Sequence, residues 1–149
     1  MRENSAEILL VEDNPDDLDM TLHALRKANV ANRIEVARDG AEALEYIFCE
    51  GVHADRRIED GPKVVLLDLK LPKIDGMEVL ARIKSDPRTK SIPVVMLTSS
   101  QEQRDVIESY NLGVNSYIVK PVNFEAFAAL IHEFEMYWLL FNKVPELKA

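Results

Sequence analysis

Short apolar runs alternate with amphipathic stretches along most of the chain. Runs such as VVLL at 64–67 and VVML at 94–97 are apolar at every position and lack the polar alternation of a half-exposed strand. Strands that are apolar on both faces are typical of a parallel sheet covered by helices on both sides. The predicted strands span residues 7–13, 33–37, 63–69, 92–98 and 116–121.

The stretches between these runs carry helix signals. In the first one, Asn14 suits the N-cap and Pro15 the first helical position. Leu18, Leu22 and Leu25 then repeat at i, i+4 and i+7, which predicts one apolar stripe along the helix. The predicted helices span residues 14–29, 39–48, 76–86, 101–113 and 123–141.

Strict alternation of strand and helix predicts one α/β domain over residues 1–149, with a doubly wound, five-stranded parallel sheet and five helices. Two segments stand out within it. Residues 50–62 are polar without a period and are predicted to form a loop. The helix over 101–113 has only Val106, Ile107 and Tyr110 as apolar anchors, which makes it a candidate two-state element.

The composition excludes several classes of protein. A net charge of −8 argues against nucleic acid as a direct partner, because binding phosphates needs a basic surface. We expect no membrane-spanning segment, and the start of the chain becomes acidic too early for a secretory signal. The single cysteine, Cys49, excludes an internal disulfide and favours a reducing, cytoplasmic location.

Polar residues collect where the predicted strands end. Strand one ends in Glu12 and Asp13, strand three in Asp68, strand four in Thr98, and strand five in Lys120. In doubly wound sheets, ligands bind outside the carboxyl ends of the strands, so these side chains should converge there. Alone, each acid would be an ordinary cap or turn residue, but together they predict a site.

The residue types at this predicted site favour Mg²⁺ and phosphoryl transfer. Carboxylates close together repel one another unless a cation lies among them, and few oxygen ligands favour Mg²⁺. Zinc is disfavoured because no His or Cys ends a strand. Asp68 is the candidate nucleophile, able to form an aspartyl-phosphate, while the ammonium of Lys120 would neutralise charge on the transferred group.

Four segments, LLVEDN, VVLLDLKLPKIDG, PVVMLTSS and GVNSYIVKPV, occur in an order and spacing that resemble the receiver domain of two-component response regulators. The resemblance covers about residues 6–141 and implies a flavodoxin-like fold. It implies a sensor histidine kinase as phosphodonor and Asp68 as phosphoacceptor. Glu12 and Asp13 would be the acidic pair at Mg²⁺, and the backbone carbonyl of Lys70 would complete the protein's ligands.

The same resemblance assigns a switch. Lys120 matches the lysine that contacts the phosphoryl group, and Thr98 and Tyr117 match the hydroxyl and the aromatic ring that respond to it. Such a protein is a phosphoacceptor and not an enzyme, apart from its own phosphotransfer and dephosphorylation.

The last predicted helix carries more apolar residues than packing on a sheet requires. It is apolar nearly all round in its second half, which predicts an interface and a homodimer. Its contact residues would be Phe134, Tyr137, Trp138 and Phe141. A fold-back onto the domain itself is the alternative. Residues 142–149 are too few for an output domain, so signalling by protein contact is expected, as in the similar single-domain regulators of bacterial phytochromes.

Three other functions are alternatives to this one. A phosphohydrolase of the haloacid-dehalogenase kind needs a second Asp two positions after the nucleophile, where this chain has Lys70. A flavin or nucleotide binder needs a loop after strand one that tolerates phosphate, whereas VEDNPDDLD is strongly acidic. A docking module that never accepts a phosphoryl group stays open.

Overall fold

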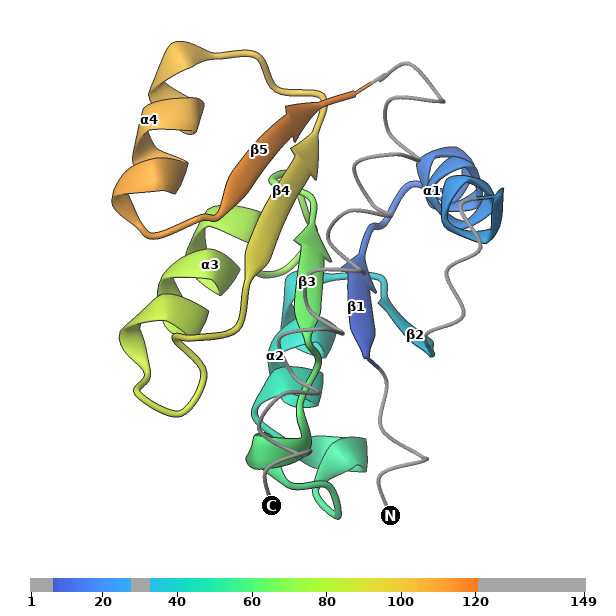
Figure 1. Cartoon of the computed structure of the whole chain (residues 1–149), viewed down its shortest axis with the longest axis vertical. Coiled ribbons are helices and arrows are strands. Elements are labelled where there is room, and N and C mark those ends of the chain that lie inside the picture. Colours follow the sequence, from blue (N-terminus) through green and yellow to red (C-terminus); the bar gives the residue numbers. More distant parts are fainter. Residues whose placement is uncertain (1–6, 28–32, 121–149) are drawn as a thin grey trace, which may run out of the picture. The chain divides into compact units, whose positions relative to one another are not determined.

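Five parallel strands form one sheet in the order β2-β1-β3-β4-β5 (Figure 1). The structure is a computed structural model, which describes residues 7–27 and 33–120. The strands are β1 (Ile8–Val11), β2 (Ile34–Ala37), β3 (Val64–Leu67), β4 (Val94–Thr98) and β5 (Ser116–Val119). This strand order is that of the flavodoxin-like doubly wound fold, as predicted.

The register of the central strands decides where functional residues lie. Val11 of β1 pairs with Leu67 of β3, so the next residues, Glu12 and Asp68, leave the sheet side by side. On the other side of β3, β4 pairs with β5 through Thr98 and Val119, and Lys120 follows directly. The predicted convergence at the carboxyl edge of the sheet is therefore confirmed.

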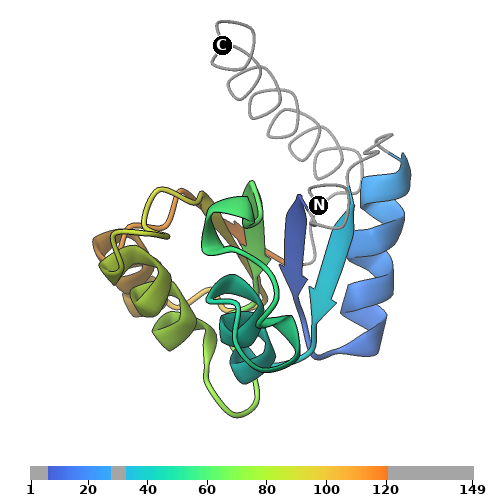
Figure 2. The same ribbon diagram turned by 90° about the horizontal axis from the view of Figure 1, so that it is seen from below.

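Three helices belong to the same compact unit as the sheet: α2 (Gly40–Ile47), α3 (Gly76–Ser85) and α4 (Gln103–Asn111). The helices α2 and α3 lie next to each other (Figure 1 and Figure 2). Their buried residues share one apolar core with alternate residues of β1, β3 and β4. The core-forming side chains include Leu9, Val65, Met96, Ile47 and Leu80.

Side-chain caps explain where two helices begin. Asp39 accepts a hydrogen bond from the amide of Glu42 at the start of α2, and the Glu42 carboxylate accepts one from the amide of Arg38 in return. Asp75 caps α3 through the amide of Glu78. Both caps satisfy amides that the first helical turn leaves without partners.

Helix α4 shows a difference from the sequence prediction. Of its predicted anchors, Ile107 and Tyr110 are each 51% exposed and Val106 is half-buried. Ser109 is the helix's buried residue. The prediction of Ile107 and Tyr110 as anchors is wrong, because the helix turns a different side toward the protein.

The segment 50–62 contains two 3₁₀ turns that its composition did not indicate, Gly51–His53 and Ile58–Asp60. Arg56 lies between them, with its guanidinium 3.8 Å from the centre of the Tyr46 ring. It also donates a hydrogen bond of 2.6 Å to the Tyr46 carbonyl. The segment is therefore tied to α2 by a cation–π contact and a hydrogen bond.

Helix α1 (Pro15–Lys27) falls almost entirely in a second compact unit, of which the structure describes residues 16–27. Two residues of its predicted stripe, Leu18 and Leu25, are buried, and Leu22 is half-buried. The predicted helix over 123–141, with the proposed interface, lies outside the described residues. Across the part of the chain that is described, no helix is long and apolar enough to span a membrane.

Candidate functional site

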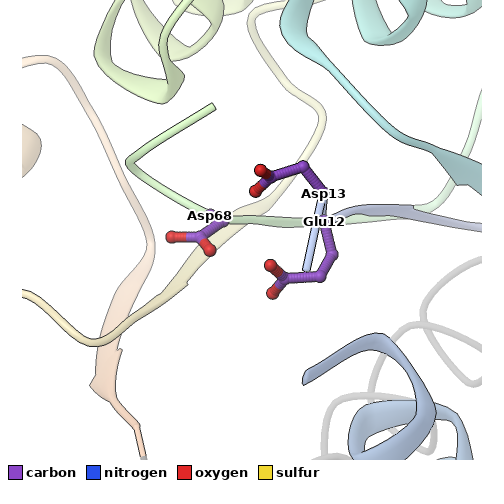
Figure 3. Close-up of side chains that lie close together, drawn as sticks. All are labelled: Glu12, Asp13 and Asp68. Atoms are coloured by element: carbon purple, nitrogen blue, oxygen red, sulfur yellow. The ribbon is translucent and has the colours of Figure 1, made fainter. Parts of the chain in front are cut away.

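Three carboxylates meet at the carboxyl edge of the sheet (Figure 3). One oxygen from each of Glu12, Asp13 and Asp68 lies within 4.8 Å of the others. Glu12 and Asp68 are only 2% and 8% exposed, whereas Asp13 is open to solvent. We call these three residues the acidic cluster. The ends of β1 and β3 hold it in place, so its geometry depends on the sheet and not on a flexible loop.

A lysine is buried against this acidic cluster. Lys120 follows β5, and its amide donates a 2.7 Å hydrogen bond to the carbonyl of Thr98. Its ammonium lies 2.7 Å from Oε1 of Glu12 and 3.3 Å from Oδ2 of Asp68. Because its side chain is 6% exposed, this charge is held by its carboxylate partners rather than by bulk water.

The pKa of Glu12 reflects its burial and the charged groups around it. Its pKa is raised from 4.5 to about 7. Burial is the largest cause, the hydrogen bond from Lys120 acts in the opposite direction, and the nearby charge of Asp68 contributes to the same rise. One ammonium is therefore insufficient for the buried acids. A divalent cation beside Asp13 and Asp68 would supply the missing positive charge, and an all-oxygen ligand set suits a hard ion such as Mg²⁺.

The loop after β3 is closely fitted around Asp68. The amide of Lys70 donates a long, 3.4 Å hydrogen bond to Oδ1 of Asp68. A Cβ atom added to Gly76 would lie 2.1 Å from the carbonyl oxygen of Asp68, so only glycine fits there. The backbone of Lys70 thus lies at the acidic cluster, while its side chain is exposed. Metal binding by its carbonyl stays a prediction.

The hydroxyl groups of the predicted switch connect through Ser100. Thr98 is 1% exposed, and its hydroxyl accepts a 3.4 Å hydrogen bond from the amide of Ser100. The hydroxyl of Tyr117 donates a 3.1 Å hydrogen bond to the carbonyl of Ser100, and burial raises the pKa of Tyr117. The hydroxyl of Ser100 in turn donates to Oδ2 of Asp105 at 2.5 Å. Sequence reasoning placed Thr98 and Tyr117 in this region and missed Asp105, for which no spacing gives a signal.

Beside the acidic cluster lies a cavity of about 670 Å³. Asp13 and Lys70 line it on one side, and Asp105 and Glu108 of α4 line it on another. Asp13 of the acidic cluster and the first turn of α4 therefore line the same cavity.

The sequence matches the response regulator receiver domain over residues 8–132. It is 41% identical over 143 residues to the probable methanogenesis regulatory protein FilR2 of Methanothrix harundinacea, covering 93% of this chain and 86% of that protein. It is 39% identical over 132 residues to the response regulator Rcp1 of Synechocystis, covering 89% of this chain and 88% of Rcp1.

Solved structures agree with this match. The bacteriophytochrome response regulator RtBRR is 53% identical, with a TM-score of 0.77, over 87% of this chain and 78% of that one. The phosphorylated cyanobacterial phytochrome response regulator RcpA is 43% identical, with a TM-score of 0.78, over 91% of this chain and 94% of that one. A Mn²⁺-bound form of Rcp1 is 39% identical, with a TM-score of 0.77, over 90% of this chain and 94% of that one. This chain belongs to the response regulator receiver family.

Proposed function

We propose that Asp68 accepts a phosphoryl group from a sensor histidine kinase. The observation that carries the proposal is the position of Asp68, which is nearly buried at the end of the central strand β3 with Lys120 against one of its oxygens. The ammonium holds Oδ2, whereas among the described residues 7–27 and 33–120 Oδ1 accepts the long bond from the Lys70 amide and no other. Oδ1 is therefore the oxygen better placed to attack phosphorus.

In the proposed step, the carboxylate oxygen forms a bond to phosphorus as the bond from phosphorus to the donor histidine nitrogen breaks. Lys120 would neutralise part of the charge on the phosphoryl oxygens, because its ammonium already lies beside Asp68. Thr98 and Tyr117 would respond to the new charge, which adds acceptor oxygens next to the end of β4.

Mg²⁺ is the proposed cofactor, with Asp13, Asp68 and the Lys70 carbonyl as direct ligands and Glu12 as the second acid of the pair. When bound, it would screen the charge of the phosphoryl oxygens during an in-line transfer. The convergence of carboxylate oxygens in the acidic cluster supports this, as does the Mn²⁺-bound form of the relative Rcp1.

The proposed partner is a phytochrome-type sensor kinase in the cytoplasm. Support comes from relatives whose names link them to phytochromes, at up to 53% identity. We further propose one receiver domain over residues 1–149 that signals by protein contact and dimerises through its last helix. The sequence of that helix supports a homodimer with Trp138 as its anchor, and Trp138→Ala should lower the dimer fraction in sedimentation velocity.

The first experiment is intact mass spectrometry after incubation with acetyl phosphate and Mg²⁺. We expect the wild type to gain one phosphoryl group and Asp68→Asn to gain none, and chelation of Mg²⁺ should prevent the gain. Asp75→Asn is the matched control, because this exposed acid of the same loop caps α3 and Asn caps equally well. A folded wild type that gains no mass would favour the docking module instead.

A further inference from the structure

We infer that Asp105 is a positioning residue that governs the lifetime of the phosphorylated form, by binding the hydroxyl of Ser100. The inference rests on the proposed function of Asp68. It concerns a residue of α4 that the sequence pattern did not connect with the site.

The hydroxyl of Ser100 is fully engaged in this structure. It donates its one proton to Oδ2 of Asp105 at 2.5 Å. Its oxygen also accepts a 3.4 Å hydrogen bond from the amide of Glu102. Ser100 is only 8% exposed, so water competes poorly for the same proton. A serine hydroxyl has a single donor, and Asp105 therefore leaves it none for any other acceptor.

Ser100 lies among the residues of the predicted switch. It follows Thr98 by two residues at the end of β4, and its amide binds the Thr98 hydroxyl. Its carbonyl accepts the hydroxyl of Tyr117 from β5. One residue thus joins the strand end beside the acidic cluster, the aromatic residue of the switch, and the first turn of α4 through Asp105.

Asp105 also lines the space next to the acidic cluster. This cavity of about 670 Å³ is also lined by Asp13, a member of the acidic cluster, and by Lys70 beside it. A water molecule that hydrolyses the aspartyl-phosphate attacks phosphorus and breaks the bond to the Asp68 oxygen. The products are the free carboxylate and inorganic phosphate, and the proton from water passes to solvent or to phosphate.

A free hydroxyl at Ser100 would hydrogen-bond this water or a phosphoryl oxygen and favour the attack. Asp105 prevents that by accepting the proton itself. The expected consequence is that Asp105 slows dephosphorylation and acts only through Ser100.

A double-mutant cycle tests this directly. Wild type, Asp105→Ala, Ser100→Ala and the double variant are phosphorylated with acetyl phosphate and Mg²⁺, the donor is removed, and loss of the phosphoryl group is followed by intact mass. We expect Asp105→Ala to raise the dephosphorylation rate constant by about threefold, and to change nothing when Ser100 is already Ala. The matched control is Glu108→Ala, an exposed acid of the same helix that lines the same cavity, which should leave the rate unchanged.

Two results would overturn the inference. One is an unchanged rate in Asp105→Ala. The other is an equal rise in both backgrounds, which would mean that Asp105 acts by stabilising the first turn of α4 and not through Ser100. If circular dichroism shows that Asp105→Ala is unfolded, the same cycle is run with Asp105→Asn, which keeps one acceptor oxygen but no charge and should give a smaller rise. A wild type that never gains a phosphoryl group would refute the proposed function itself, which separates the two failures.

Discussion

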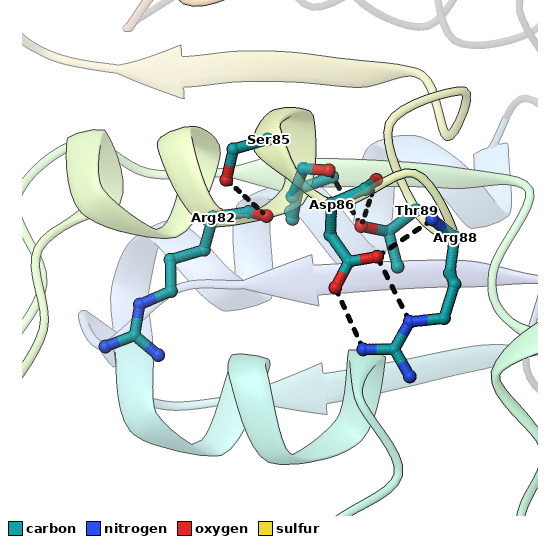
Figure 4. Close-up of polar contacts among 6 residues, drawn as sticks. Arg82, Ser85, Asp86, Arg88 and Thr89 are labelled. Atoms are coloured by element: carbon teal, nitrogen blue, oxygen red, sulfur yellow. Dashed lines mark hydrogen bonds and ion pairs between the residues drawn. The ribbon is translucent and has the colours of Figure 1, made fainter.

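Two of the protein's carboxylate–cation pairs lie at opposite ends of the parallel strands. The pKa values of their two acids are shifted in opposite directions. At the carboxyl edge, burial raises the pKa of Glu12 to about 7 although Lys120 lies 2.7 Å away. At the other edge, where the chain turns from α3 into β4, the hydrogen bonds from Arg88 lower the pKa of Asp86 to about 2 (Figure 4). The Arg88 side chain is 61% exposed and that of Asp86 23%, so this pair keeps part of its contact with water.

The comparison shows that a salt bridge has no fixed effect on its acid. The Asp86 carboxylate accepts two bonds from the Arg88 guanidinium, of 3.1 and 2.9 Å, and its side chain stays 23% exposed. Glu12 has lost its water and shares one ammonium with Asp68. Desolvation therefore outweighs the single cation at the acidic cluster. A pKa shifted by burial and a specific charge partner is characteristic of functional sites. The Asp86–Arg88 pair, in contrast, lies at the end of a helix.

The largest expected effect comes from removing the buried cation. Lys120→Met leaves two buried carboxylates without their counter-charge, and we expect about 3 kcal/mol lower free energy of unfolding at pH 8 without divalent metal. Urea unfolding in EDTA measures it. Arg88→Met, the control in the partly exposed pair, should have a much smaller effect. Equal losses in the two variants would contradict the distinction between the pairs.

The pH dependence of the metal-free protein should show the raised pKa of Glu12. Between pH 4.5 and about 7 the folded state holds a proton that the unfolded state has released, so the contribution of Glu12 to stability falls as pH rises. Glu12→Gln should flatten this part of the curve of unfolding free energy against pH. Saturating Mg²⁺ should also flatten it, because added positive charge favours the ionised acid. If neither Glu12→Gln nor Mg²⁺ changes the slope of unfolding free energy against pH, that slope does not come from Glu12.

A smaller effect is expected from the hydroxyl buried near Asp86. Thr89 is fully buried, and its hydroxyl donates a 2.7 Å hydrogen bond to the carbonyl of Ile83. Thr89→Val should lower the free energy of unfolding by about 1 kcal/mol in chemical denaturation, because that bond is lost inside the protein. Ser85→Ala is the control, since the Ser85 hydroxyl makes a longer, exposed bond of 3.4 Å to Arg82 and should matter little. A similar loss in both would show that burial does not distinguish them.

The smallest effect is expected from the half-buried acid Asp86 itself. Because its pKa lies below the ordinary 3.8, Asp86 contributes stability above pH 3.8 that is lost as pH falls toward about 2. Asp86→Asn should therefore reduce the dependence of the urea midpoint on pH within this acid range only. Asp55→Asn, in the segment 50–62, serves as the control for a general change in net charge. If Asp86→Asn changed the urea midpoint only near neutral pH, the lowered pKa of Asp86 would not be the cause.

The site was predictable where the backbone alone decides its geometry. Parallel strands of similar length end at the same edge, so Glu12, Asp13, Asp68 and Lys120 could be brought together from their strand-end positions. Their family resemblance then supplied roles that the strand pattern does not contain. The direct bond between Lys120 and Glu12 was not predicted, because strand order says which residues are neighbours and not which atoms meet.

The sequence did not predict contacts that depend on the direction of a side chain. The link from Ser100 to Asp105 needs the exact rotation of α4, and that rotation also placed Ile107 and Tyr110 in solvent. The helix has few apolar residues, so its hydrophobic pattern could not fix the face that it turns toward the protein. The 3₁₀ turns of segment 50–62 were missed for a related reason, since Arg56 holds them through polar contacts that leave no apolar period.

The bond between Lys120 and Glu12 joins residues 108 positions apart in the chain. A contact of this separation closes a very long loop, so it can form stably only after the strands between have assembled. During synthesis, β1 and β3 can present their acids long before β5 emerges with the lysine that binds them. A chain interrupted before Lys120 would thus carry Asp68 without the Lys120 ammonium. Uptake of a phosphoryl group would then require that β5 has been synthesised and has joined the sheet.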